Sequence, residues 1–360
     1  SSTTSATIYG TLNVPSGISS SGGVTLSGNV AMTSTSSHTG LASFAGGISA
    51  SGGTFGNNIF IQNREIGFTS SNVLFGTNAG PIITSGTDNI LIGLCAGRGI
   101  TNQVNNVAIG TNALRSNSPT SRNVALGTDA LLNNTQSDTV GIGSEALANN
   151  TGLYAVGLGT RAGSGNVGSN VLAIGYQALM NSGAGNQIGI GPYALYNNTS
   201  PSAQHNIAIG LNSMWTNSGL QNVAIGNDTL IGTVGYLGQS GNRNTVMGYR
   251  AGYNNRTGSD NVFLGHQAGL GNSSGNNNIY IGSGVSGSTL GTVSNEIVIG
   301  TNAAGFGSNT TTIGPTTQTS ATIYGLLNAP SGISASGGTF ANNVQANGYI
   351  LTSNARSWFL

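Results

Sequence analysis

Lysine does not occur in this chain of 360 residues, and charged side chains of all kinds make up only 5 % of it. Nine Arg against eight Asp and Glu leave a formal net charge of +1, which provides no basic surface for a nucleic acid or an anionic membrane. The single cysteine, Cys95, excludes an intrachain disulfide. No apolar run approaches the about eighteen residues of a membrane-spanning helix. We therefore expect no nucleic-acid partner and no membrane insertion.

The scarcity of charge accompanies 60 glycines and abundant Ser, Thr and Asn, a composition that is also typical of disordered segments. Regularly placed Val and Ile argue against disorder, because they recur in one phrase, Asn-Val-Ala-Ile-Gly-x-x-Ala-Leu, at 106–114 and, with small changes, at 206–214 and 222–230. The glycines of fifteen such copies are Gly76, Gly93, Gly110, Gly127, Gly143, Gly159, Gly175, Gly191, Gly210, Gly226, Gly248, Gly265, Gly282, Gly300 and Gly314. Their spacing, mostly 16 or 17 residues, fits one coil of a β-solenoid with two short strands and two turns.

Positions within a coil are counted from its glycine, which is position 0. Position −4 is most often Asn, and stacking of the coils would bring these amides into a ladder of side-chain hydrogen bonds. The predicted ladder comprises Asn72, Asn89, Asn106, Asn123, Asn206, Asn222, Asn244, Asn261 and Asn278.

Positions −2 and +4 exchange size from coil to coil. Position +4 is large where −2 is small, as for Leu131 and Ala125, and it is small where −2 is large, as for Gly269 and Phe263. Close-packed interiors tolerate volume-conserving changes best, so the two positions are predicted to fill one shared space. Only the coil of Gly159 departs from this pattern, with glycine at both positions.

Positions −3 and −1 are mostly Val, Ile or Leu, and alternation puts them on the opposite strand face from position −2. Both strand faces are therefore predicted to be buried, whereas a single thin roll buries only one. Burial of four apolar side chains per coil contributes about 1.5 to 3 kcal/mol each. This gain does not offset the backbone entropy lost when roughly seventeen residues become ordered, at about 1 to 2 kcal/mol each. Neighbouring coils and partner chains must supply the rest, and the simplest partner is the same coil in other subunits.

The repeated Asn-x-Ala-Ile-Gly-x-x-Ala phrase resembles the head repeats of YadA-like trimeric autotransporter adhesins and the repeats of bacteriophage tail-fibre-domain proteins. The resemblance covers about residues 66–314. It implies an all-β, elongated homotrimer of left-handed parallel β-rolls, with one roll in each chain. The repeat of this chain differs from that of those adhesin heads in length, since its period is longer than theirs.

Two nearly identical segments bracket the array, since 5–23 and 320–338 differ at only three of nineteen positions. Three explanations of the duplicated segments remain open. The chain is one unit of a longer tandem polypeptide, its subunits join head to tail into a filament, or the duplication has no role in assembly. The chain begins at Ser1 without Met, as a processed chain or a fragment does. We expect a β-rich shaft module over 1–65, a β-roll array of about fifteen coils over 66–318, and a module over 319–360 that duplicates the first.

The longest spacing in the array, which separates Gly226 from Gly248, predicts a protruding loop. Aromatic and Arg side chains gather near it, and such side chains suit contacts with a glycan or a receptor. The candidate contact residues are Trp215, Tyr236, Arg243, Tyr249, Arg250 and Tyr253. The alternative is an insertion that the solenoid tolerates without using it.

Asn-x-Ser/Thr sequons in the array are candidates for N-glycosylation if the source has a secretory pathway that attaches sugars. They place the sugar on Asn133, Asn149, Asn198, Asn227, Asn255, Asn272 and Asn309. The alternative is that Asn and Thr are simply favourable turn residues.

No catalytic or cofactor-binding constellation is recognisable. Segments 157–162 and 189–194 match a dinucleotide fingerprint superficially, but they are ordinary copies of the repeat and no helix-period segment follows them. The three His are scattered, whereas a metal site or a catalytic triad needs convergent groups. Asp129, Glu145 and Asp228 share position +2 with Asn, Gln, Tyr and Arg, which predicts a solvated column. We expect no enzyme activity, no metal and no cofactor.

Together these features predict an extracellular structural fibre or filament protein with an adhesive role toward a surface glycan or receptor. Its main partner is itself, as a homotrimer and, under the head-to-tail interpretation, as a filament. Two alternatives remain, a bacteriophage tail fibre that takes part in receptor binding and a self-assembling, glycosylated filament subunit. The corresponding locations are a cell-surface fibre, a virion tail and a free filament.

Overall fold

The computed structural model describes residues 71–116, 120–216, 218–231, 240–288 and 291–318 with their side chains, and the backbone of six short strands before them. Those strands are β1 (Thr25–Leu26), β2 (Asn29–Ala31), β3 (Ser43–Phe44), β4 (Gly47–Ser49), β5 (Ile59–Ile61) and β6 (Arg64–Thr69). The chain divides into two compact units, Ser1–Thr316 and Thr317–Leu360. The duplicated segments 5–23 and 320–338 lie outside the described residues, so the head-to-tail filament stays a prediction.

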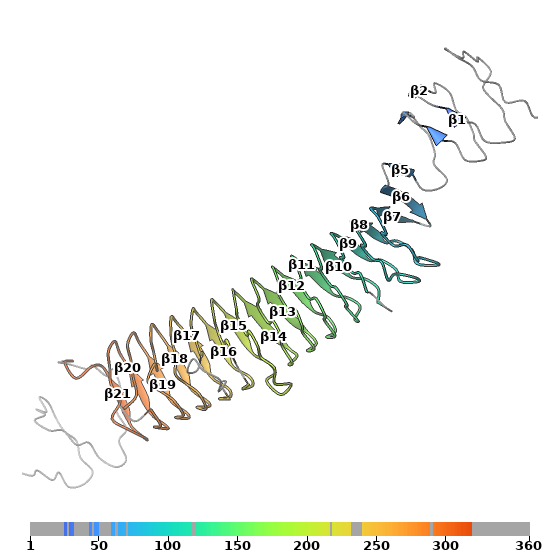
Figure 1. The fold of residues 1–360 in the computed structure, drawn as a ribbon. Helices are drawn as coiled ribbons and strands as arrows, with labels where there is room; N and C mark the ends of the chain where they lie inside the picture. Colours follow the sequence, from blue (N-terminus) through green and yellow to red (C-terminus); the bar gives the residue numbers. More distant parts are fainter. Residues whose placement is uncertain are drawn as a thin grey trace, which may run out of the picture. The chain divides into compact units, whose positions relative to one another are not determined.

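One parallel sheet runs the length of the described array, and each coil contributes one strand to it (Figure 1). Its strands are β7 (Asn72–Phe75), β8 (Ile90–Ile92), β9 (Val107–Ile109), β10 (Val124–Leu126), β11 (Val140–Ile142), β12 (Val156–Leu158), β13 (Val171–Ile174), β14 (Gln187–Ile190), β15 (Ile207–Ile209), β16 (Val223–Ile225), β17 (Thr245–Met247), β18 (Val262–Leu264), β19 (Ile279–Ile281), β20 (Ile297–Ile299) and β21 (Thr311–Ile313). Equivalent repeat positions pair directly, for example Ala108 with Ala125. The described array is therefore an all-β parallel solenoid, as the repeat predicts.

Each described coil holds one strand, not the two that its length suggested. The rest of the coil is a turn in which left-handed residues recur at positions −5, +2, +4 and +6, for example Asp129 (φ 56°) and Leu131 (φ 52°). The backbone N–H of Asp129 donates to the carbonyl of Thr111 in the preceding coil, and that of Leu131 donates to Ala146 in the following one. Because the turn satisfies its backbone groups between coils in this way, it needs no second strand.

An antiparallel hairpin covers the N-terminal end of the parallel sheet. Strand β6 pairs antiparallel with both β5 and β7. Pairing along β7 blunts a sheet edge that would otherwise invite association. The boundary predicted between residues 65 and 66 therefore falls inside β6, because the hairpin does not follow the repeat and periodicity cannot reveal it.

Positions −2, +3 and +4 form the core between the strand and the turn. Ala125, Ala130 and Leu131 are all fully buried. The shared space extends across coils, since a methyl group added to Gly141 at position −2 would lie 3.0 Å from Cγ of Leu131 in the preceding coil. The packing thus explains why sizes at −2 and +4 are exchanged.

In the coil of Gly159, where positions −2 and +4 are both glycine, the core space is occupied by a side chain of the preceding coil. A methyl group on Gly157 would lie 2.8 Å from Cγ of Leu147, and one on Gly163 would lie 2.6 Å from its Cδ2. Leu147 itself is fully buried. Glycine at both positions therefore leaves no void, because a leucine of the neighbouring coil occupies the space of two residues.

The Asn side chains at position −4 are buried and bonded from coil to coil. Nδ2 of Asn89 donates to Oδ1 of Asn72 over 2.9 Å, and Nδ2 of Asn106 donates to Oδ1 of Asn89 over 3.1 Å. The same Oδ1 atoms also accept the backbone N–H of the next Asn. In the second half of the array the pattern resumes from Asn206 to Asn278. These bonds satisfy polar groups that burial would otherwise make costly.

A second buried ladder at position +7 was not predicted from the sequence. Nδ2 of Asn150 donates to Asn134 over 3.1 Å, and Nδ2 of Asn166 donates to Asn150 over 3.0 Å. In the coils of Gly143 and Gly159 this second ladder stands in for the first, because position −4 is there Thr139 and Ala155, and it recurs between Asn255 and Asn272. The coils of Gly127, Gly143 and Gly159 thus keep an interior amide bond although the position that supplies it changes.

A buried carboxylate replaces the amide ladder near the C-terminal end of the described array. Glu296 occupies position −4 and is fully buried. Its Oε2 accepts a hydrogen bond from the Tyr280 hydroxyl over 2.8 Å, and its Oε1 accepts one from the N–H of Gly307 over 2.8 Å. Burial, and secondarily the bond to Glu296, raise the pKa of the Tyr280 hydroxyl, so Tyr280 remains a donor at neutral pH.

Removal of that hydroxyl is expected to destabilise the last coils. Tyr280→Phe leaves Oε2 of a buried carboxylate without its donor, which should lower the free energy of unfolding by about 1.5 to 3 kcal/mol. Urea denaturation at neutral pH measures the change. Tyr154→Phe is the control, because this tyrosine is 59 % exposed. Equal midpoints for the two variants would contradict a structural role for the Tyr280–Glu296 bond.

Candidate functional site

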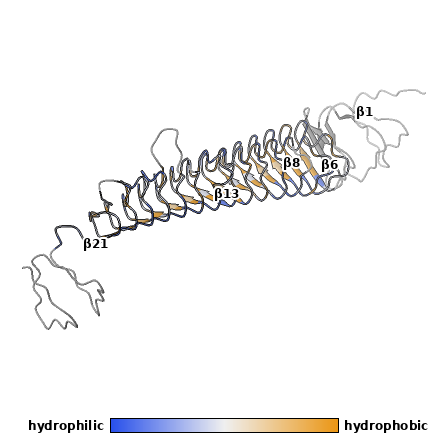
Figure 2. Cartoon of the chain, turned by 90° about the horizontal axis from the view of Figure 1, so that it is seen from below, coloured by the Kyte–Doolittle hydropathy of each residue, from blue (hydrophilic) through white to orange (hydrophobic). Residues whose placement is uncertain are grey.

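The outer face of the sheet is a long apolar surface. Positions −3 and −1 point away from the core, and Ile109 and Ile142 are each 38 % exposed. Position −1 is apolar in every coil from Phe75 to Ile313, and position −3 is interrupted only by Thr245 and Thr311. Hydrophobic colour accordingly follows the strands in Figure 2. One chain by itself therefore buries a single face of its sheet.

The dimensions of this outer face follow from the strand geometry. Fifteen strands are separated by fourteen steps of about 4.8 Å, which gives a length of about 67 Å. The two columns stand about 7 Å apart, so the strip between them covers about 470 Å². The largest apolar patch of a typical monomer covers about 300 to 600 Å² and is often an interaction site. The outer face is therefore a candidate surface for association.

A second surface lies on the turns, at positions +1, +2 and +5, where four aromatic rings meet. The rings of Tyr176 and Tyr193 lie 5.3 Å apart and nearly perpendicular, and those of Tyr193 and Tyr196 lie 5.6 Å apart. Trp215 is 6.4 Å from Tyr193 and 6.2 Å from Tyr196. Tyr176 is 43 % exposed and the other three are half-buried. Repetition in successive coils thus assembles an aromatic cluster from three coils.

The same turn positions carry further rings in the coils of Gly248 and Gly265. Tyr249 stacks on His266 with centroids 5.5 Å apart. The guanidinium of Arg250 lies 5.2 Å from the centre of the Tyr249 ring and 5.4 Å from that of Tyr253. Such cation–π contacts hold a guanidinium in place while leaving part of it exposed. We call the seven residues Tyr176, Tyr193, Tyr196, Trp215, Tyr249, Tyr253 and His266 the aromatic edge.

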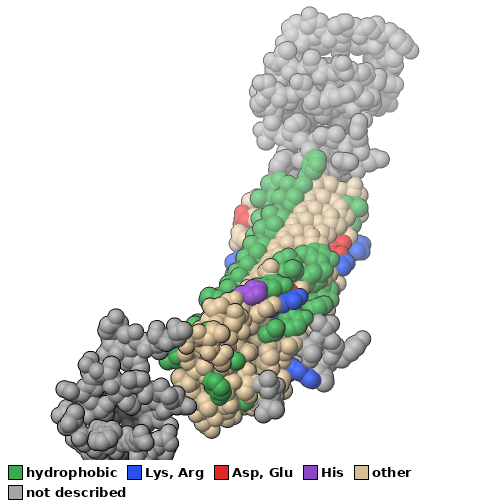
Figure 3. Space-filling model, turned by 90° about the vertical axis from the view of Figure 1, so that its left-hand side faces the viewer, with side chains coloured by type: hydrophobic (Ala, Val, Ile, Leu, Met, Phe, Trp, Pro, Cys, Tyr) green, Lys and Arg blue, Asp and Glu red, His purple; other side chains and the backbone are tan. Residues whose placement is uncertain are grey.

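The coil of Gly226 connects the two halves of the aromatic edge through polar contacts. Nδ2 of Asn212 donates to Oδ1 of Asp228 over 3.0 Å. Nε of Arg250 lies 3.7 Å from Oδ2 of the same carboxylate. Asp228 thus joins position +2 of the preceding coil to position +2 of the following one, and the edge continues across the coil that lacks a ring. The space-filling view in Figure 3 shows hydrophobic side chains in runs along the described part of the chain, with a His and basic side chains among them.

Charge at the aromatic edge is paired within the chain. Arg161 donates from Nε and from Nη2 to the two carboxylate oxygens of Glu145, and this bond raises the pKa of Arg161. Desolvation, followed by the neighbouring Tyr176, raises the pKa of Tyr193. Arg161 therefore stays charged and Tyr193 stays neutral at neutral pH. Most side chains at position +2 are half-buried. Several of them bond to the +2 side chain of a neighbouring coil, as Arg161 does to Glu145.

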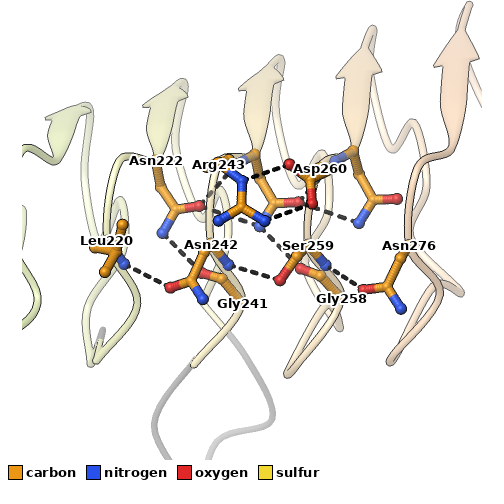
Figure 4. Close-up of polar contacts among 11 residues, drawn as sticks. Leu220, Asn222, Gly241, Asn242, Arg243, Gly258, Ser259, Asp260 and Asn276 are labelled. Carbon is orange, nitrogen blue, oxygen red and sulfur yellow. Dashed lines mark hydrogen bonds and ion pairs between the residues drawn. The ribbon is translucent and has the colours of Figure 1, made fainter.

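Four of the six predicted contact residues belong to the aromatic edge or contact it, namely Trp215, Tyr249, Arg250 and Tyr253. Arg243 lies elsewhere, at position −5 before β17, where it binds both carboxylate oxygens of Asp260 over 2.6 and 2.8 Å (Figure 4). Tyr236 lies outside the described residues. Proximity in sequence grouped Arg243 with Arg250, but the two stand at opposite ends of the strand.

Tyr176, Tyr193 and Tyr196 were missed, although the sequence carries a signal for them. They stand at positions +1, +2 and +5 of successive coils, the positions that Tyr249, Arg250 and Trp215 occupy in their own coils. Aligning the coils by column, rather than scanning along the chain, would have brought them together.

The stack continues in register across the long spacing between Gly226 and Gly248. The backbone N–H of Leu220 donates to Oδ1 of Asn242 over 2.9 Å, and the N–H of Asn242 donates to Oγ of Ser259 over 3.0 Å (Figure 4). Nδ2 of Asn244 still reaches Oδ1 of Asn222. The hydrogen bonds between coils therefore remain unbroken at this point, and 232–239 lie outside the described residues.

The seven predicted sequons occupy two different environments, and an eighth, Asn197-Asn198-Thr199, was missed although its Asn197 is exposed. Asn133, Asn149, Asn227 and Asn309 are exposed. Asn198, Asn255 and Asn272 have their amides in the buried column at position +7. Nδ2 of Asn272 donates to Oδ1 of Asn255, for example, over 3.1 Å. The folded coil has no room for a sugar on these three amides, which corrects the expectation for them and leaves four of the seven predicted sites.

The two histidines of the array, His205 and His266, are exposed and stand at opposite ends of their strands. The described coils contain no group of three or more His, Cys, Asp or Glu that could hold a metal ion. None of the described segments forms a helix long and apolar enough to cross a membrane. No protein-family model matches the chain, and no curated protein matches it significantly.

Proposed function

We propose that this chain is the subunit of an extracellular structural fibre with an attachment role, and that three copies assemble through the outer faces of their sheets. The observation that carries the proposal is the continuous apolar outer face, with both of its columns half-exposed in a single chain. A surface about 67 Å long exceeds what a small ligand covers. Its chemistry repeats coil after coil, so the partner that matches it everywhere is another copy of the same stack.

The narrowness of the outer face favours three copies. Each strand presents only two outward side chains, so each face is two side chains wide. Three such faces can close around one axis with every face touching both others. Burial of the Val, Ile and Leu side chains there would contribute about 25 cal/mol per Å² removed from water.

The amide ladders suit a structural role. They place hydrogen bonds inside the stack as well as along its backbone, and the coils then share their stability with their neighbours. Most carboxylates of the described coils pair with Asn, Arg or Tyr side chains, as Asp129 does with Asn112 and Glu145 with Arg161. This pairing supports a role without catalysis.

Assembly is expected to fail when charge enters the outer face. Ile142→Asp would bring three carboxylates together near the common axis, where like charges repel in a poorly hydrated space. Size-exclusion chromatography with light scattering should show three times the chain mass for the unchanged protein and a single chain mass for the variant.

Val167→Asp is the matched control, because Val167 is 54 % exposed and lies in the turn away from the sheet. It should assemble as the unchanged protein does. A protein that is monomeric at micromolar concentration without substitution would refute the proposal, as would full assembly of Ile142→Asp.

A further inference from the structure

We propose that the aromatic edge is a binding site for an extended carbohydrate chain that lies along the stack. This inference extends the attachment role proposed above by naming a ligand class and its site. It needs a single chain only, so it can be tested apart from assembly.

The rings of the edge offer the surface that a sugar requires. A pyranose presents apolar C–H groups on its faces and hydroxyls around its rim. Tyr176, Tyr193, Tyr196 and Trp215 are held at angles of 45° to 85° to one another, so they form an angled cradle rather than one flat stack. Rings fixed by their neighbours lose little freedom on binding. Sugar faces would pack on the exposed parts of these rings.

Polar groups for the sugar rim stand beside the rings. Arg250 is held by two aromatic rings and by one long contact of 3.7 Å to Asp228, and its side chain remains 43 % exposed. Its guanidinium therefore has donors to spare for hydroxyl or carboxylate oxygens. The pair of Arg161 and Glu145, with exposures of 41 % and 38 %, supplies further donors and acceptors at the other end of the edge. Apolar faces next to charged groups match an amphipathic ligand.

The layout favours a chain of sugars over a single one. The rings belong to the coils of Gly175, Gly191, Gly210, Gly248 and Gly265, and the coil of Gly226 contributes Asp228 between them. Each coil advances by about 4.8 Å along the stack, which is close to the length that one pyranose adds to an extended glycan. Six successive coils therefore present about six sugar-sized steps in a row.

Other partners fit this edge less well. An added peptide strand would need free backbone groups, but the N–H of Asn212, Asp228 and Arg250 each donate to the preceding coil. A nucleic acid would need a basic surface, and the chain has a formal charge of +1. A further copy of the chain already has the more apolar and longer outer face available. Among these classes of partner, carbohydrate therefore fits the aromatic edge best.

Binding is tested with soluble hexasaccharides of three kinds, a neutral glucan, an N-acetylglucosamine oligomer and an alternating uronate–hexosamine oligomer. We expect at least one to bind at micromolar to millimolar concentration in titration calorimetry and to change Trp fluorescence. Trp215→Ala combined with Tyr196→Ala should weaken that binding at least ten-fold, and Arg250→Gln should weaken it several-fold.

Tyr154→Ala is the control for binding, since this exposed tyrosine occupies the left-handed position −5, outside the edge. Its affinity should equal that of the unchanged chain. Circular dichroism and the oligomeric mass of each variant establish that folding and assembly are intact. Absence of binding to all three hexasaccharides at about 10 mM would overturn the proposal, as would unchanged affinity in the double variant. A loss of assembly in the double variant would instead assign the edge to contacts between copies.

Discussion

Gly127→Ala is expected to destabilise the array by about 3 kcal/mol or more, although it adds a single methyl group. Gly127 has a φ of 134°, a region that residues with a Cβ rarely adopt. The added methyl would also lie 2.6 Å from the carbonyl oxygen of Gly143 in the next coil. Because that neighbour is backbone, and is fixed by its own coil, it has little room to move.

Gly271→Ala supplies the matched control, because nothing lies within 4 Å of the methyl it would add. This substitution should be neutral or slightly stabilising, since Ala restricts the unfolded chain. The midpoint of chemical denaturation, at one fixed protein concentration, compares the two variants. Similar midpoints would show that close approach at position 0 does not hold the coils together.

Leu131→Ala is expected to cost about 2 to 5 kcal/mol, the usual range for a cavity left by a buried leucine. Leu131 is fully buried and packs against Gly141 of the next coil. Asp129→Asn, two residues earlier, is the control, because Asn tolerates the left-handed conformation of Asp129 and the site is only half-buried. It should change the free energy of unfolding by less than about 0.5 kcal/mol.

A double substitution tests the shared space directly. Leu131→Gly with Gly141→Leu moves the large side chain from position +4 to position −2, as the sequence itself does in the coil of Phe263. The pair should be more stable than the sum of the two single changes predicts, by about 0.5 to 3 kcal/mol of coupling. Additive effects would contradict the idea that the two positions fill one volume.

Several features of the fold were predictable because every copy of the repeat shows the same residue types at the same positions. Fifteen copies made the glycine position, the Asn ladder and the exchange of size between −2 and +4 visible in one chain. The direction of alternation also placed Ile109 and Ile142 on the face opposite Ala108 and Gly141. That face is half-exposed in the single chain.

Other features were not predictable from period alone. The coil is long enough for two strands, but left-handed residues such as Leu131 and Asn133 turn the second segment into a bonded turn. Burial of Asn198 and Asn255 depends on which way that turn points. The hairpin of β5 and β6 breaks the period, so a repeat-based boundary passed through it.

The sequence by itself determined the solenoid, its register and the residue types of each column. The reason is that stacking pairs equivalent repeat positions, so the pattern of one repeat defines the whole array. Only the tertiary structure decided which columns face each other across coils. It placed Trp215 beside Tyr193, separated Arg243 from Arg250, and paired Tyr280 with the buried Glu296. The physical reason is that the path of the turn, set by its left-handed residues and its bonds to both neighbouring coils, fixes these directions.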